Sequence, residues 1–181
     1  MDYTEQFKYC VFRVFLIFGA EVLGLMLGKG LFWAAASVMT ILPEGMKQTL
    51  VSDRFGSVTA ALIMMLLLGA VFRDDGKKHA AYADADFVLV LITLILMLAC
   101  YFIPVIFYNP FDSTRAVKTV YYMLYYPCRW VIEIFGAELK PAVAIGTGII
   151  LGVQFIIYNL SYGSYKMRHP FSFKIMNEED E

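Results

Sequence analysis

Charged residues are scarce in this sequence. Only 17% of its 181 residues are Asp, Glu, Lys or Arg, whereas 60% are hydrophobic and the mean hydropathy is +0.63. A soluble domain has about 45–50% apolar and about 25% charged residues, so a chain of this composition could not cover its apolar surface in water. The composition therefore excludes an ordinary soluble protein and an intrinsically disordered one, and it indicates a membrane protein.

The sequence also lacks net charge, paired cysteines and catalytic motifs. Its 15 Lys+Arg and 16 Asp+Glu leave a net charge of −1, so no basic field gathers nucleic acid, and we expect no nucleic-acid partner. Cys10, Cys100 and Cys128 have no CxxC or CxxCH spacing, which argues against a disulfide framework and against a metal or haem site. No GxSxG, HExxH or Walker loop is present. We therefore expect no catalytic residue, no metal and no cofactor.

Four stretches are long and apolar enough to cross a bilayer. A hydrocarbon core of about 30 Å needs about 20 helical residues, because a helix rises about 1.5 Å per residue. The four stretches are residues 9–28, 55–72, 87–108 and 141–162. The sequence therefore predicts a single all-α integral membrane domain over residues 1–181, with four transmembrane helices and one or two amphipathic interfacial or re-entrant helices.

Residues 31–42 form a shorter apolar stretch. They follow Gly28, Lys29 and Gly30, which favour a helix break, and they end at Pro43. Because the stretch is too short to span, we expect a separate interfacial or re-entrant helix here.

Within the expected interfacial segment of residues 114–137, residues 119–137 are long enough to form a fifth span, but Arg129 and Glu133 lie near their middle, beside Pro127. Inserting an Arg at the centre of a membrane helix costs roughly 2.5–3.5 kcal/mol. Aromatic side chains with a polar tip prefer the head-group level. The segment carries five of them: Tyr121, Tyr122, Tyr125, Tyr126 and Trp130. The sequence therefore favours four spans, with this segment lying in the interface.

The basic residues predict the orientation. One cluster lies between the second and third spans, and another follows the fourth span. These clusters are Arg73, Lys77 and Lys78, and Lys166, Arg168 and Lys174. With four spans both clusters lie on one side of the membrane, which is the cytoplasmic side by the positive-inside rule. We therefore expect both termini, and a tail of residues 163–181, to be cytoplasmic.

Small residues repeat every fourth position in the first and fourth spans. This spacing lets two membrane helices approach closely. The two stripes are Ala20, Gly24 and Gly28, and Ala144, Gly148 and Gly152. We expect the first and fourth spans to pack against each other through these stripes, in preference to forming a homodimer face.

Glu21 is the residue whose place in the membrane most needs an explanation, since a carboxyl group near mid-membrane must be neutral, paired or hydrated. Thr59, Thr147 and Cys100 fall near the same depth, and Gln154 lies deeper in the fourth span. One interpretation is a proton, ion or ligand pathway through Glu21, Thr59, Thr147 and Gln154. The other is a protonated Glu21 held by structural hydrogen bonds.

The remaining polar residues have simpler expected roles. Arg13 lies about one helical turn inside the cytoplasmic boundary, so its side chain can reach outward as an anchor. Arg129 and Glu133, at positions i and i+4, are expected to form a surface ion pair, and Gln154 to hydrogen-bond between helices. His79 and His169 stand alone in basic segments, where solvated side chains are expected.

Three functions remain after these exclusions. The first is a non-enzymatic integral membrane subunit, or accessory partner, of a larger membrane complex. The second is a small oligomeric transporter or channel that uses Glu21. The third is a membrane-embedded lipid-modifying enzyme, with Glu21, Arg13 and Tyr126 as candidate residues. The expected partners are membrane lipids and either another membrane protein or copies of the same chain.

Overall fold

The computed structural model describes residues 3–38, 52–81, 87–111 and 113–169. Within these ranges the chain is helical and contains no strand. The elements are α1 (Tyr3–Val38), α3 (Asp53–Ala81), α4 (Phe87–Ile106), α5 (Arg115–Leu124), the short 3-10 helix η2 (Tyr126–Cys128), α6 (Arg129–Phe135) and α7 (Leu139–Arg168). Four of them are long and apolar enough to cross a membrane, as the sequence predicts: α1, α3, α4 and α7.

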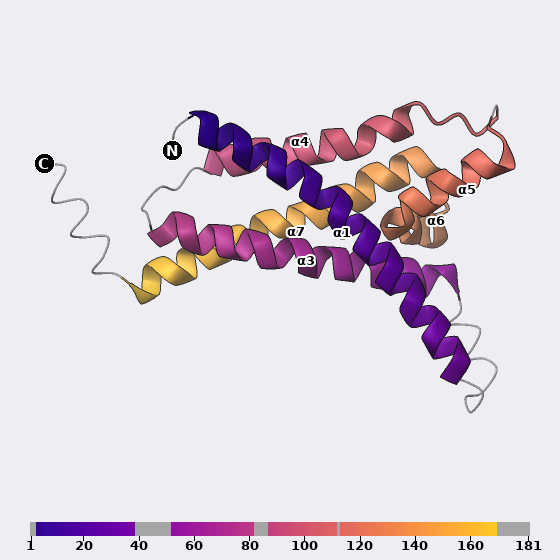
Figure 1. Cartoon of the computed structure of the whole chain (residues 1–181), viewed down its shortest axis with the longest axis horizontal. Helices are drawn as coiled ribbons and strands as arrows, with labels where there is room; N and C mark the ends of the chain where they lie inside the picture. The colour runs from indigo at the N-terminus through magenta and orange to yellow at the C-terminus, as the bar shows by residue number, and fades with distance from the viewer. Residues whose placement is uncertain (1–2, 39–51, 82–86, 112, 170–181) are drawn as a thin grey trace, which may run out of the picture.

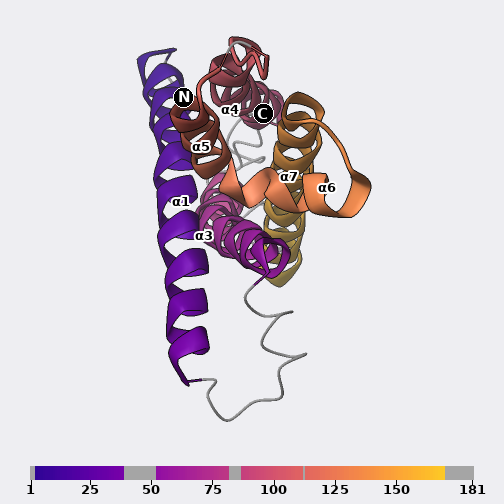
Figure 2. The same ribbon diagram turned by 90° about the vertical axis from the view of Figure 1, so that its right-hand side faces the viewer.

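The four long helices form one bundle (Figure 1). Helix α3 packs against α1 and α7, and α4 packs against the same two helices from the other side. Successive long helices alternate in direction, so α1 begins and α7 ends at one end of the bundle, which we call the charged end. Helices α5, η2 and α6 lie across the opposite end, which we call the capped end (Figure 2).

Helix α1 is unbroken through Gly28, Lys29 and Gly30, so the predicted separate helix over residues 31–42 is wrong for the part that the structure describes. Residues 31–38 continue α1, and residues 39–42 lie outside the described ranges. Each helical glycine costs only about 1 kcal/mol relative to alanine. In an apolar environment that cost is smaller than losing backbone hydrogen bonds, and Gly28 is also used for packing, as shown below.

Residues 114–137 form three short helices and no fifth span. Thr114 caps the start of α5 by accepting a hydrogen bond from the Val117 amide at 3.4 Å. Gly136, in the left-handed conformation with φ 61°, ends α6. Placement of this segment in a membrane interface stays a prediction.

Two of the tyrosines predicted for the head-group level lie in the protein interior. Tyr125 is 1% exposed and Tyr126 is 2% exposed, so the protein covers both side chains, and their depth in a membrane stays a prediction. Tyr121, Tyr122 and Trp130 are partly buried. The difference arises because η2 turns inward and contacts α3, α7 and α1, which a flat helix on a membrane surface would not do.

Large hydrophobic side chains lie on the outside of the bundle as well as in its core. Core side chains such as Ile17, Met64 and Met97 are fully buried. Large hydrophobic residues on the same helices face outward, among them Phe15, Leu66, Ile95 and Ile156. An outer surface of this kind is typical of a protein that is surrounded by lipid.

Candidate functional site

The small-residue stripe of α1 packs against α3. A Cβ added to Gly24 would lie 2.9 Å from the backbone oxygen of Ala60, and one added to Gly28 would lie 2.9 Å from the Ala60 Cβ. Ala20, the third member of the stripe, is also buried. The predicted use of this stripe in close helix packing is therefore correct, but its partner is α3 and not α7.

The stripe of α7 faces outward. Ala144, Gly148 and Gly152 are all exposed, and a Cβ added to either glycine would meet nothing within 4 Å. The predicted packing of the first span against the fourth through the two stripes is therefore wrong. Helix α7 instead uses its opposite face in the bundle, where Gly146 lies against Cys128, with 3.0 Å between an added Cβ and the Cys128 Cβ.

Helices α3 and α7 meet through different glycines, which the sequence analysis did not single out. A Cβ added to Gly76 would lie 2.6 Å from the backbone oxygen of Tyr158, so the two backbones are too close for a larger residue.

Gln154 Nε2 donates to the Met65 carbonyl at 3.3 Å and to the Ile150 carbonyl at 3.0 Å. The expected interhelical hydrogen bond of Gln154 is therefore confirmed.

Glu21 is buried near the capped end. It is 1% exposed, and its Oε1 atom has no hydrogen-bond partner within the described structure. Thr147, also 1% exposed, lies 3.5 Å from the Cys128 sulfur. Burial raises the pKa of the Cys128 thiol to about 12, and the nearby Glu21 charge adds to this shift. Glu21 therefore shares one buried polar region with Cys128 and Thr147.

The tyrosine pair beside this region closes the capped end of the bundle. Tyr125 Oη donates to the Tyr101 carbonyl at 3.0 Å, and Tyr101 Oη donates to the Leu124 carbonyl at 3.3 Å. Burial raises the pKa of Tyr125, with a smaller contribution from Glu21. The reciprocal bonds join α4 to the turn between α5 and η2, and they keep the region beside Glu21 closed.

The four predicted pathway residues do not form one cluster. Thr59 donates to the Phe55 carbonyl of its own helix at 2.9 Å. Gln154 lies seven residues beyond Thr147, which is about 10 Å along α7. Only Glu21 and Thr147 are close to a common neighbour, Cys128.

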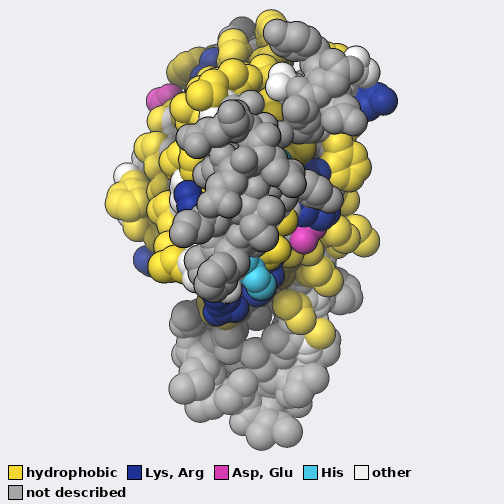
Figure 3. Space-filling model, turned by 90° about the vertical axis from the view of Figure 1, so that its left-hand side faces the viewer, with side chains coloured by type: hydrophobic (Ala, Val, Ile, Leu, Met, Phe, Trp, Pro, Cys, Tyr) yellow, Lys and Arg dark blue, Asp and Glu magenta, His cyan; other side chains and the backbone are white. Residues whose placement is uncertain are grey.

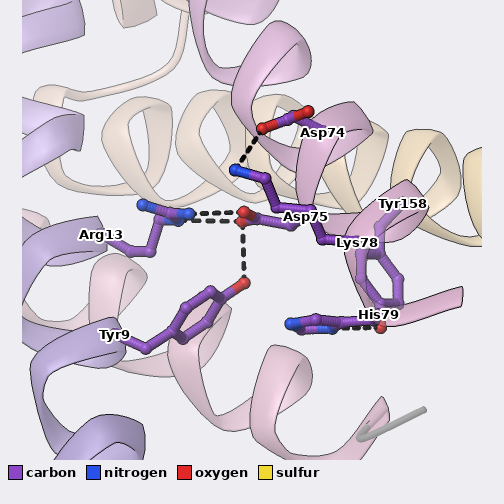
Figure 4. A network of polar contacts seen from close by, with 7 residues as sticks. All are labelled: Tyr9, Arg13, Asp74, Asp75, Lys78, His79 and Tyr158. Atoms are coloured by element: carbon purple, nitrogen blue, oxygen red, sulfur yellow. Dashed lines mark hydrogen bonds and ion pairs between the residues drawn. The ribbon is translucent and has the colours of Figure 1, made fainter. Parts of the chain in front are cut away.

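A second buried polar group lies at the charged end (Figure 4). Arg13 contacts both carboxylate oxygens of Asp75, at 2.5 Å from Nη2 and 2.9 Å from Nε. Tyr9 Oη donates to the same carboxylate at 2.9 Å. The side chains of Arg13 and Asp75 are only 12% and 6% exposed. The predicted role of Arg13 as an outward-reaching anchor is therefore wrong, because its charge is neutralised inside the bundle.

This pair was not predicted from the sequence, because the apolar stretch of the second span ends at residue 72. Helix α3 continues to Ala81, which turns Asp75 towards α1. The neighbouring Asp74 points the other way and pairs with Lys78 at 2.7 Å on the surface. The sequence signal that could have indicated this ion pair is an acidic residue and an Arg at similar depths in two adjacent spans.

His79 extends the polar group to α7. Its Nδ1 lies 2.8 Å from the Tyr158 hydroxyl, and its ring is 5.9 Å from that of Tyr9. The prediction of a solvated His79 is therefore wrong. His169 is exposed, as expected, and its ring lies 4.5 Å from the ring of Tyr165.

Charges at the capped end join α6 to α3. Arg129 pairs with Asp53 at 2.8 Å and with Glu133 at 3.3 Å, so the expected Arg129–Glu133 pair is confirmed. Lys29 lies over the Tyr126 ring, 5.1 Å from its centre. These contacts fix the capped end to the start of α3 and to the second half of α1.

The described residues contain no group of three or more His, Cys, Asp or Glu side chains that could hold a metal ion. Comparison of the chain with known protein families, with curated proteins and with solved structures finds no match in any of the three. Function is therefore inferred from the geometry of this chain alone.

Proposed function

We propose that the protein is a non-enzymatic integral membrane subunit that binds a transmembrane helix of another membrane protein through the open face of α7. The observation that carries the proposal is the exposure of Ala144, Gly148 and Gly152, which the fold leaves uncovered. The matching stripe of α1 is covered by α3 in the same molecule. A transmembrane helix of the partner protein would pack against the α7 stripe in the way that α3 packs against the α1 stripe.

The residues beside the α7 stripe favour such a contact. Each small residue is followed by a β-branched one, and Ile145 and Ile149 are 48% and 43% exposed. Stiff β-branched side chains next to a row of small residues form a ridge and a groove, and they lose little entropy on packing. In lipid, association depends on such close packing because the hydrophobic effect between helices is absent.

The proposal places the protein in a membrane with both termini in the cytoplasm. Four long apolar helices and an apolar outer surface support the membrane location. Lys and Arg side chains are visible at several places on the charged end, where α1 begins and α7 ends (Figure 3). By the positive-inside rule that end faces the cytoplasm.

The test replaces two glycines of the α7 stripe with larger residues. The Gly148→Leu, Gly152→Leu double variant should lose the co-purifying membrane protein in a mild detergent, as measured by the mass of the purified particle. Gly19→Leu is the matched control, because Gly19 is also a helical glycine with nothing within 4 Å. A wild-type particle containing only this chain, whether as a monomer or as a dimer that the double variant abolishes, would contradict a heterologous partner.

A second candidate function has one observation in its favour. Glu21 is buried and its Oε1 is unpartnered, as an acid that exchanges a proton or binds a cation would require. Glu21→Gln should then preserve folding but abolish pH-dependent flux into proteoliposomes. Unchanged flux, or no flux in the wild type, would exclude the transporter. The lipid-modifying enzyme gains no such support, since Arg13 is already paired with Asp75.

A further inference from the structure

A basic cavity lies between α3 and α7 at the charged end. Its volume is about 410 Å³, and three cations line it: Arg73 and Lys77 from α3, and Arg168 from α7. The hydroxyl-bearing residues Ser161 and Ser164 complete its polar wall. Like charges repel, so an anion bound in the cavity would lower the energy of three cations that share it.

The acids nearby do not neutralise these cations. Asp74 is engaged by Lys78 at 2.7 Å, and Asp75 is engaged by Arg13 inside the bundle. Among the described residues, Arg73, Lys77 and Arg168 form no ion pair with any acid. Within the described residues, the cavity therefore keeps a net positive charge.

The helix dipole does not explain the position of these charges. Cations are favoured within the last turn of a helix, where the free carbonyls lie. Arg168 meets this condition, but Arg73 and Lys77 lie about two turns and one turn before the end of α3 at Ala81. Their shared feature is the cavity and not the helix end.

We propose that this cavity binds a phosphate group. Arginine matches the tetrahedral oxygens of phosphate with two parallel N–H donors, lysine adds a point charge, and serine hydroxyls donate further hydrogen bonds. Leu160, 65% exposed, also lines the cavity and offers an apolar surface beside the cations. This combination fits the phosphate and first acyl carbons of an anionic phospholipid, and basic cavities between membrane helices commonly bind such head groups.

The experiment measures binding of three probes to the purified full chain in a non-ionic detergent. Dioctanoyl phosphatidylglycerol carries a phosphate on lipid chains, inorganic phosphate carries no chains, and dioctanoylglycerol carries the chains alone. The Arg73→Gln, Lys77→Gln variant should bind the phospholipid about 30-fold more weakly, as expected for two cation–phosphate contacts. The matched control, Lys8→Gln with Lys166→Gln, removes two charges from the same end outside the cavity and should bind within about threefold of wild type.

The single variant Arg168→Gln serves if the double variant does not fold, as judged by circular dichroism. It should weaken phospholipid binding about fivefold. If inorganic phosphate binds as tightly as the phospholipid and depends on the same residues, the phosphate site stands and its ligand is a soluble phosphate. Equal losses in the cavity and control variants, equal binding of dioctanoylglycerol, or no saturable binding would each overturn the proposal.

Discussion

The small-residue stripes of α1 and α7 have the same spacing and opposite environments. Gly24 and Gly28 lie against Ala60 so closely that no larger side chain fits, whereas Gly148 and Gly152 have no neighbour within 4 Å. The α1 stripe shares its helix pair with the Arg13–Asp75 ion pair, which adds a directional contact between α1 and α3. No comparable charge pair accompanies the α7 stripe in the described residues. A stripe of small residues therefore shows that another helix can pack closely against it. Contacts outside the stripe determine which helix does so.

Removing the Arg13–Asp75 ion pair should have the largest effect on the stability of the contact between α1 and α3. Asp75→Ala would leave the Arg13 charge buried without a partner, which typically destabilises a protein by about 3–5 kcal/mol. The measurement is the free energy of unfolding in detergent, and Asp74→Ala is the control because Asp74 pairs on the surface. The control should leave stability nearly unchanged. Similar losses in both variants would show that Arg13 finds another partner or water.

Enlarging one glycine in each stripe tests the comparison directly. Gly24→Leu forces α1 and α3 apart at Ala60 and should cost about 1–3 kcal/mol of stability. Gly148→Leu should change the stability of the isolated chain by less than about 0.5 kcal/mol, because its side chain points into open space. Thermal unfolding of the two variants under identical conditions is the measurement. A loss of stability from Gly148→Leu as large as that from Gly24→Leu would refute the difference between the stripes.

Glu21, beside the α1 stripe, should behave differently from Gln154, whose Oε1 is also unpartnered but whose Nε2 donates two hydrogen bonds. Glu21→Met replaces a side chain with an unpartnered oxygen by an apolar one of similar size, so stability should be unchanged or rise by about 1 kcal/mol. Gln154→Met is the control, since it removes two hydrogen bonds and should destabilise by about 1–3 kcal/mol. Chemical denaturation of both variants decides the point. Destabilisation by Glu21→Met would show that the carboxyl group makes a stabilising contact.

The smallest effect on stability comes from comparing two thiols on either side of α7, one buried against Gly146 and one exposed at position 148, and its readout is a labelling rate. The pKa of Cys128 is raised to about 12, so at pH 8 its thiolate is about a thousandfold less abundant than that of an ordinary cysteine. Maleimide labelling of a chain with Cys128 as its single thiol should be correspondingly slow and should accelerate tenfold per pH unit. A chain whose single thiol is introduced by Gly148→Cys, with Cys128 replaced by Ser, should react rapidly. Equal rates would contradict the burial of Cys128.

The sequence was sufficient for the four long helices, because each carries an apolar stretch of membrane length that charged or helix-breaking segments separate. It also placed Glu21 in the interior and Gln154 between helices. It could not assign partners: the spacing of Gly24 and Gly28 is the same whether α3 or α7 lies against them. The end predicted for the second long helix was also too early, because the charged residues after residue 72 indicated a loop. Helix α3 instead continues to Ala81, and Asp75 within it pairs with Arg13.

The unbroken α1 has a consequence for how the protein sits in a bilayer. Its 36 residues extend about 54 Å at 1.5 Å per residue. A hydrocarbon core of about 30 Å holds at most about 39 Å of a helix tilted by 40°. At least ten residues or so must therefore project into water or head groups, and Figure 1 shows the last turns of α1 extending beyond the bundle. Because these turns continue α1 without a break, a force on them would act on the contact with Ala60 and on the Arg13–Asp75 ion pair beyond it.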